Sequence, residues 1–158
     1  WSHTDLHVPQ LKPEDYANVA KKAVFEEGYD ALKYDFFSFD EEGRKISVEE
    51  YTRLLHPKYQ KMIEKRVEAV RNAIGDDVDI IAECHSRLDA QSAVQVAKIM
   101  EKYNILYFEE PTIPNMYRLI RRCPWPPASG SIRAGSIVPT LKTGPSRLSS
   151  LTSETAAV

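Results

Sequence analysis

Apolar residues recur at helical spacing in three segments of the chain. In each segment they lie three or four positions apart, so they fall on one face of an α-helix. The first segment follows Pro13, which suits a first helical turn, and stops at Gly28, while the second ends at Gly75. The repeating positions are Val19, Ala20, Ala23 and Val24, then Met62, Val67, Val70 and Ile74, and finally Ala93, Val94, Ala97 and Met100. We therefore expect three amphipathic helices.

Short apolar runs follow these segments. They cover residues 29–36, 78–82 and 105–108, and a further short run lies at 5–8. Runs of this length predict buried strands. Because helices and strands alternate along the chain, the sequence predicts an α/β fold with parallel strands joined by helical crossovers.

A polar segment separates the first predicted strand from the second predicted helix. Ser47 and Glu50 have the spacing of a capping box, which predicts another helical region there. Pro57 breaks or restarts that region because proline lacks the amide proton of a helix interior.

Ionisable residues stand at the ends of the three main predicted strands. They are Lys33 and Asp35, then Glu83 and His85, then Glu109 and Glu110. The carboxyl ends of parallel strands form the reactive rim of α/β folds. Carboxylate oxygens suit Mg²⁺, and a histidine beside them can donate or accept protons. The pattern favours a magnesium site with an acid or base next to it.

Each of these residues also has a structural interpretation. Glu83 can be an acid at a helix start, and His85 can cap the helix that follows. Glu109 and Glu110 can be a solvated loop pair, and Lys33 can be a surface lysine whose stem covers apolar neighbours. Residue types and spacing leave both interpretations open.

Composition excludes some classes of function. The chain has 158 residues and a net charge of -2, which gives no electrostatic reason to expect nucleic acid or a membrane as partner. No apolar run approaches the roughly 18 residues of a membrane span. The two cysteines, Cys84 and Cys123, have no metal or redox spacing and are expected to be free thiols. We expect a cytoplasmic location.

Three motifs together resemble the enolase superfamily. They are Gly-Tyr-Asp-Ala-Leu-Lys-Tyr-Asp at 28–35, Ile-Ile-Ala-Glu-Cys-His-Ser-Arg-Leu at 80–88 and Leu-Tyr-Phe-Glu-Glu-Pro at 106–111. The similarity covers about residues 11–122 and is strongest to the mandelate racemase subgroup, among acid-sugar dehydratases of the galactonate dehydratase kind. It implies a partial TIM-type (β/α) barrel, about the first half of one, in residues 1–122.

The resemblance also implies roles for individual residues. Glu83 and Glu109 match the first two Mg²⁺ ligands, and His85 matches the histidine that helps to expel the β-hydroxyl as water. Lys33 matches the first lysine of a Lys-x-Lys strand and would stabilise the substrate or transition state. Asp35 replaces the second lysine, which argues against a lysine-based racemase. Three residues, Asp35, Arg87 and Glu110, are expected to line the substrate site.

Residues 123–158 differ from the rest of the chain. They contain five of the ten prolines and only four charged side chains, so we expect an irregular tail. Permitted codons from Pro124 onward encode Met-Ala-Ser-Gly-Glu-Arg in a shifted frame, and Gly-Glu-Arg is the family's motif for the third metal ligand. We interpret the chain as a fragment with a frameshift after about residue 122, in which that ligand is lost.

The expected activity of the intact parent enzyme is Mg²⁺-dependent dehydration of a sugar acid. It would proceed through α-proton abstraction and an enolate, and the base would be a histidine on a later strand. The fragment alone is expected to be inactive. Two alternatives stay open, a non-catalytic remnant and a racemase or cycloisomerase of the same superfamily. The partner is a small sugar acid, and the intact parent is expected to form a homo-oligomer.

Overall fold

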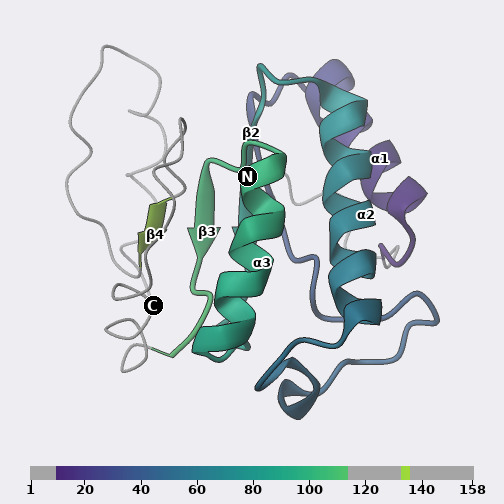
Figure 1. Cartoon of the computed structure of the whole chain (residues 1–158). Helices are drawn as coiled ribbons and strands as arrows, with labels where there is room; N and C mark the ends of the chain where they lie inside the picture. The colour runs from purple at the N-terminus through teal and green to yellow at the C-terminus, as the bar shows by residue number, and fades with distance from the viewer. Residues whose placement is uncertain (1–9, 114–132, 136–158) are drawn as a thin grey trace, which may run out of the picture.

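Four parallel strands, hydrogen-bonded in the order β1-β2-β3-β4, form the sheet (Figure 1). The computed structural model describes residues 10–113 and 133–135. The strands are β1 (Ala31–Tyr34), β2 (Asp79–Glu83), β3 (Tyr107–Glu109) and β4 (Arg133–Gly135). The helices are α1 (Pro13–Lys21), the π-helical η1 (Lys22–Glu26), the 3-10 helix η2 (Val48–Tyr51), α2 (Pro57–Ile74) and α3 (Ala90–Lys102). The parallel α/β fold predicted from the sequence is confirmed.

The three helices begin and end close to the predicted signals. Pro13 and Pro57 lie in the first turns of α1 and α2, where a missing amide proton costs no hydrogen bond. Gly75 ends α2 with a φ of 75°, a backbone conformation that residues with a Cβ atom rarely adopt. The carboxylate of Asp89 caps α3 by accepting from the amide of Ser92.

One local prediction needs correction. The strand predicted at 29–36 covers only Ala31–Tyr34, because the chain still turns after Gly28, whose φ is 79°, and turns again at Asp35. The capping box predicted at Ser47 and Glu50 is present and starts the short 3-10 helix η2, and a new helix, α2, begins at Pro57. The possible strand at 5–8 lies outside the described residues.

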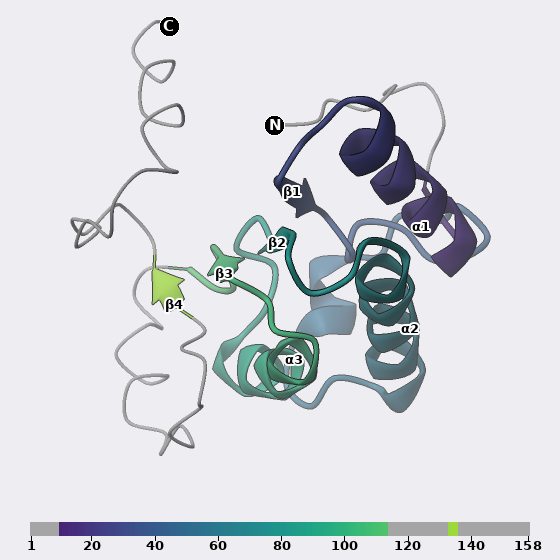
Figure 2. The same cartoon turned by 90° about the horizontal axis from the view of Figure 1, so that it is seen from above.

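Helices α1, α2 and α3 cover one face of the sheet, as the view from above shows (Figure 2). Along each strand alternate residues point toward the helices. The buried side chains of this layer include Leu32, Ile80, Ala82 and Phe108, and Val67 and Val70 of α2 pack in the same core. The intervening residues alternate with this layer along the strands, and Lys33 and Ile81 among them are half-buried.

Two arginines of α2 are buried in this core. Arg66 has no exposed surface and donates to the carbonyl oxygens of Leu11, Phe36 and Phe39. Arg71 is also buried and donates to the carbonyls of Tyr103, Gly75, Val78 and Asn104. Each guanidinium therefore supplies hydrogen-bond donors to carbonyl oxygens of the chain packed around it.

Three residues of the tail segment form a strand. Residues 133–135 form β4 and pair with β3, although an irregular tail was predicted for 123–158. The rest of that segment lies outside the described residues. Within the described part of the chain, no helix has the length and apolar character needed to cross a bilayer.

Candidate active site at the strand ends

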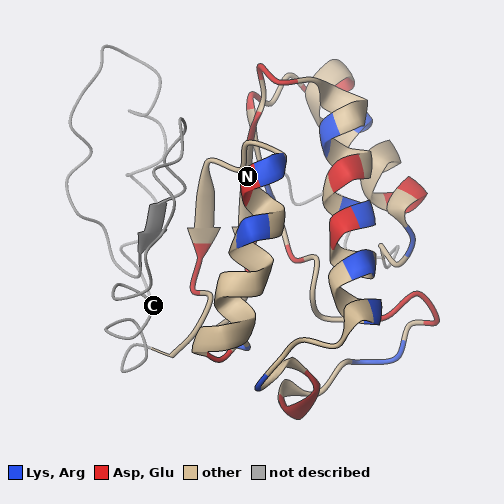
Figure 3. Cartoon of the chain, viewed as in Figure 1, with Lys and Arg blue, Asp and Glu red and all other residues tan. Residues whose placement is uncertain are grey.

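Three charged side chains from neighbouring strands meet at the carboxyl end of the sheet. Glu83 and Glu109 are register partners on β2 and β3, so parallel pairing sets them side by side. Lys33 reaches them from β1, and its Nζ lies 3.1 Å from Glu83 Oε2 and 3.1 Å from Glu109 Oε2. In Figure 3 the end of β3 is red, the colour of Asp and Glu. The proximity expected from the strand-end pattern is present.

The two carboxylates differ in acidity because their partners differ. Burial alone would raise the pKa of Glu83, but hydrogen bonds from the backbone amide of His85 and from Lys33 outweigh it and lower that pKa. Burial raises the pKa of Glu109, and the nearby charge of Glu83 adds to the rise against the effect of Lys33. Of the pair, Glu83 holds its negative charge more firmly.

His85 lies at the rim between two carboxylates. Its Nδ1 is 3.7 Å from Glu83 Oε1, and its Nε2 is 3.6 Å from Asp35 Oδ2. The backbone sets this position, because His85 and Ser86 both adopt the left-handed region with φ values of 50° and 56°. The side chain is 54% exposed, so a bound molecule can reach the ring. Strained backbone of this kind often occurs where a side chain is aimed at a ligand.

Asp35 holds the loop around the site together. Its Oδ1 accepts from the amides of Phe37 at 2.8 Å and Ser38 at 2.9 Å. Its Oδ2 accepts from the Ser38 hydroxyl and, at 3.2 Å, from Arg87. Arg87 also donates to Ser38 Oγ. The structure thus brings Asp35 and Arg87 together with His85, as an internal network.

Ser38 belongs to this network and was not predicted from the sequence. It lies three residues after Asp35, whose carboxylate accepts from the amides two and three positions later, as in an Asx turn. The preference of aspartate for such turns is the one local signal in the sequence for this loop. Nothing in the sequence indicates the contact between Ser38 and Arg87, which are 49 positions apart.

Glu110 reaches the site through its backbone. Its carbonyl accepts from the amide of Ser86 at 2.7 Å, its φ is 41°, and its side chain is exposed. The amide of Cys84 donates to the Glu109 carbonyl, and that of Leu88 donates to the Pro111 carbonyl, both at 3.0 Å. The loops that follow β2 and β3 are therefore hydrogen-bonded to each other beyond the strand ends.

The donor set of the site suits a hard cation. Two register-paired carboxylates already hold a positive ammonium group between them, and Mg²⁺ is commonly bound by one or two carboxylates together with water and substrate oxygens. The next position of this row, on β4, is Gly135, which carries no carboxylate. In the described residues no group of three His, Cys, Asp or Glu side chains is placed to hold a metal. Glu83 and Glu109 are the two candidate ligands.

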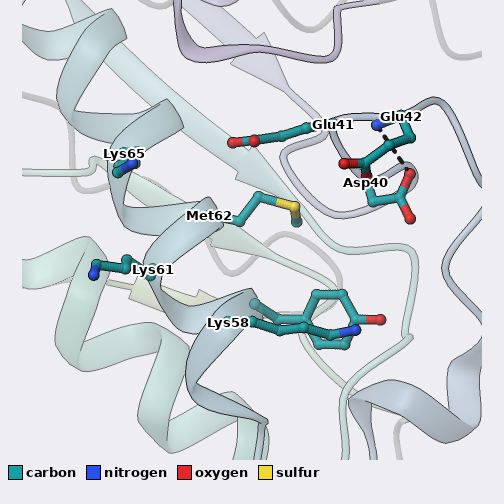
Figure 4. Close-up of a pocket in the computed structure, with 8 residues that line it drawn as sticks. Asp40, Glu41, Glu42, Lys58, Lys61, Met62 and Lys65 are labelled. Atoms are coloured by element: carbon teal, nitrogen blue, oxygen red, sulfur yellow. Dashed lines mark hydrogen bonds between the residues drawn. The ribbon is translucent and has the colours of Figure 1, made fainter.

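A pocket of about 330 Å³ lies away from the strand ends (Figure 4). Its walls come from residues 40–42 and from the first turns of α2. Asp40 is engaged by the amides of Glu42 and Arg44 and by the Arg44 side chain, so it closes its own loop. The lining carries Lys58, Lys61 and Lys65 opposite acids, and no strand-end residue contributes to it. Its mixed charge selects neither an anion nor a cation.

Comparison with known proteins gives matches across the same region. Residues 15–130 match the family described as Enolase C-terminal domain-like. The chain is 42% identical over 99 residues to D-gluconate dehydratase of Thermoproteus tenax, which covers 63% of this chain and 18% of that protein. It is 31% identical over 113 residues to D-xylonate dehydratase of Haloferax volcanii, covering 71% of this chain and 26% of that protein. The chain thus spans about a quarter or less of these relatives.

Solved structures of similar fold agree. A member of the enolase superfamily from Salmonella Typhimurium superposes with a TM-score of 0.66 and 38% identity, over 72% of this chain and 29% of that chain. A mandelate racemase/muconate lactonizing enzyme from Jannaschia sp. CCS1 gives a TM-score of 0.57 at 25% identity, over 73% of this chain and 28% of that chain. These solved structures therefore contain the same arrangement of sheet and helices as the matched part of this chain.

Proposed function

Because the chain belongs to the enolase C-terminal domain-like family, we propose that it carries part of the active site of a Mg²⁺-dependent enzyme that removes water from a sugar acid. The similar proteins named D-gluconate and D-xylonate dehydratase support this substrate class. The observation that carries the proposal is the meeting of Lys33, Glu83 and Glu109 at adjacent strand ends, with His85 beside them.

In this proposal Glu83 and Glu109 hold the metal. Both are register partners with a side-chain oxygen directed at the same cationic group, so they need little rearrangement to face a cation. When bound, Mg²⁺ supplies a Lewis acid that stabilises the negative charge developing on the carboxylate of a sugar acid. Glu83 is held in place further by the backbone amide of His85, which donates to its Oε1 at 3.1 Å.

His85 and Lys33 act on the substrate. Removal of the α-proton leaves an electron pair that forms a carbon–carbon double bond as the C–O bond to the β-hydroxyl breaks. His85 would give the departing hydroxyl a proton, so it leaves as water, and its exposed ring at the rim suits that task. The resulting enol tautomerises to a 2-keto-3-deoxy acid. The ammonium of Lys33 would stabilise negative charge on the substrate oxygens.

Asp35 and Arg87 would position these groups. Their mutual contact at 3.2 Å and the contact of Asp35 with His85 keep the imidazole close to the carboxylate pair. We expect Arg87 and the exposed Glu110 to border the sugar hydroxyls. The proton-abstracting base has no candidate among the described residues, and the family resemblance assigns it to a later strand.

A second candidate function is a non-catalytic remnant of such an enzyme. The observation that favours it is Gly135 on β4, at the register position next to Glu109, where a third carboxylate would continue the row. Under this candidate the chain alone is inactive, and the carboxylate pair reflects ancestry.

The experiment compares the chain with a chimera. In the chimera, residues 29–112 replace the matching segment of the D-gluconate dehydratase of Thermoproteus tenax. Both proteins are incubated with Mg²⁺ and D-gluconate, D-galactonate or D-xylonate, with mandelate as the racemase control, and 2-keto-3-deoxy acid is measured. We expect dehydration by the chimera, its loss in Glu83→Gln and in His85→Asn, and no change in Glu49→Gln. A folded chimera that dehydrates none of the three acids contradicts the proposed function, and activity of the chain alone contradicts the remnant.

A further inference from the structure

Lys33 occupies the space between the two candidate metal ligands. Its ammonium is 3.1 Å from an oxygen of each, and the side chains of Lys33, Glu83 and Glu109 are 19%, 10% and 31% exposed. Two neighbouring carboxylates in such a partly buried place repel each other. The ammonium offsets this repulsion and holds the pair together in the absence of a cation.

We propose that Lys33 is an internal counter-ion of the carboxylate pair and that a divalent cation must displace its ammonium in order to bind Glu83 and Glu109. This inference rests on the metal role given to the two carboxylates in the proposed function. It adds a step that the proposed function does not contain: the Lys33 ammonium leaves the carboxylate pair as the divalent cation enters.

Charge makes the two occupants exclusive. A divalent cation bound by Glu83 and Glu109 would lie close to the observed position of the Lys33 ammonium, and like charges at such a distance repel each other in a partly buried site. The Lys33 ammonium already contacts one side-chain oxygen of each glutamate, so a cation held by both carboxylates would compete with it. Binding therefore breaks both ion pairs of Lys33.

The structure allows the lysine to move while the carboxylates stay. Glu83 and Glu109 are fixed by the register of β2 and β3, and Glu83 is held further by the amide of His85 at 3.1 Å. Lys33 is attached through four flexible methylene groups to β1, one of the two edge strands of the described sheet. Its displaced ammonium stays at the rim, where the proposed function needs a cation for substrate oxygens. Metal binding would thus prepare the substrate site.

Calorimetric titration of the full chain with MgCl₂ and with MnCl₂ tests this exchange. Lys33→Met removes the charge and keeps a similar stem, while Lys98→Met removes an exposed charge from α3 as the matched control. We expect Lys33→Met to bind either cation roughly tenfold more tightly than the unchanged chain, and Lys98→Met to bind as the unchanged chain does. Equal or weaker binding by a folded Lys33→Met protein would overturn the proposal.

A second measurement covers the case in which Lys33→Met does not fold. Lysines of the unchanged chain are reductively methylated with ¹³C-formaldehyde, which keeps their charge, and the Lys33 signal is assigned with Lys33→Arg. We expect MgCl₂ to shift that signal with the same saturation as the calorimetric binding, and Glu83→Gln to abolish the shift. An unmoved signal during saturable binding, or no cation binding by any of these proteins, overturns the proposal. An exchange without dehydration by the chimera would instead contradict only the proposed function.

Discussion

Arg66 links the helix layer to the loop that carries Asp35. The guanidinium has no exposed surface, and its hydrogen bonds go to carbonyl oxygens: to Leu11 at 3.0 Å, to Phe36 at 2.9 Å and to Phe39 at 2.8 Å. Its Cζ also lies 5.3 Å from the ring centroid of Tyr16. Replacing it with methionine keeps much of the volume and removes every donor.

The magnitude of this change follows from those partners. Three carbonyl oxygens lose their donor: that of Phe36 is buried and costs about 1 to 3 kcal/mol when unpaired, and those of Leu11 and Phe39 are partly buried and cost less. Methionine also avoids the cost of burying a charge, which offsets part of the loss. We expect Arg66→Met to lower the free energy of unfolding by about 3 kcal/mol. Because Phe36 and Phe39 flank the Asp35 loop, amide hydrogen exchange at 36–39 should accelerate as well.

Urea unfolding followed by circular dichroism measures the first effect, and mass spectrometry of exchanged peptides measures the second. Lys65→Met, one position earlier and exposed, is the control and should stay close to the unchanged chain. A stability of Arg66→Met within about 0.5 kcal/mol of the unchanged chain, with unaltered exchange at 36–39, would refute the role given to Arg66.

Two other predictions concern titratable groups. Hydrogen bonds from Arg44 and Tyr59 lower the pKa of Glu50 to about 2, so its ionised form stabilises the fold above its ordinary pKa and this contribution is lost as the pH falls toward 2. The urea midpoints of the unchanged chain and Glu50→Gln should therefore differ at pH 6 and converge near pH 2, and a constant difference would contradict this. Burial raises the pKa of the Cys84 thiol, so in a Cys123→Ser background we expect a disulfide reagent to modify it only after urea is added. Rapid modification of the folded protein would contradict its burial.

The sequence was informative where a local pattern and parallel pairing act together. Apolar runs identified β1, β2 and β3, and the polar residues at their ends identified Lys33, Glu83 and Glu109 as neighbours. Their meeting follows from sheet geometry, since strand ends on one edge lie about 5 Å apart. What could not be predicted is that a single ammonium contacts both carboxylates, because that depends on register and rotamer.

Long-range contacts explain the structural features that the sequence did not predict. Arg66 lies at helical spacing between Met62 and Val70, so it falls on the apolar face of α2, but the loop carbonyls that accept from it and from Arg71 could not be identified from the sequence. The left-handed backbone of His85 likewise depends on a partner strand and has no glycine to signal it. β4 lies in a segment rich in proline, where local composition predicts no strand. The strand forms there by pairing with β3, which the local sequence does not indicate.

The hydrogen bonds between the loops after β2 and β3 have a mechanical consequence. Ser86 is tied to Glu110 and Leu88 to Pro111, so the segment carrying His85 and the segment carrying Glu109 cannot hinge separately. A force or a substitution that shifts residues 110–112 would tilt the imidazole at the same time. These hydrogen bonds therefore couple His85, the proposed proton donor, mechanically to Glu109, the second candidate ligand, and a longer loop after one strand would also disturb the loop after the other.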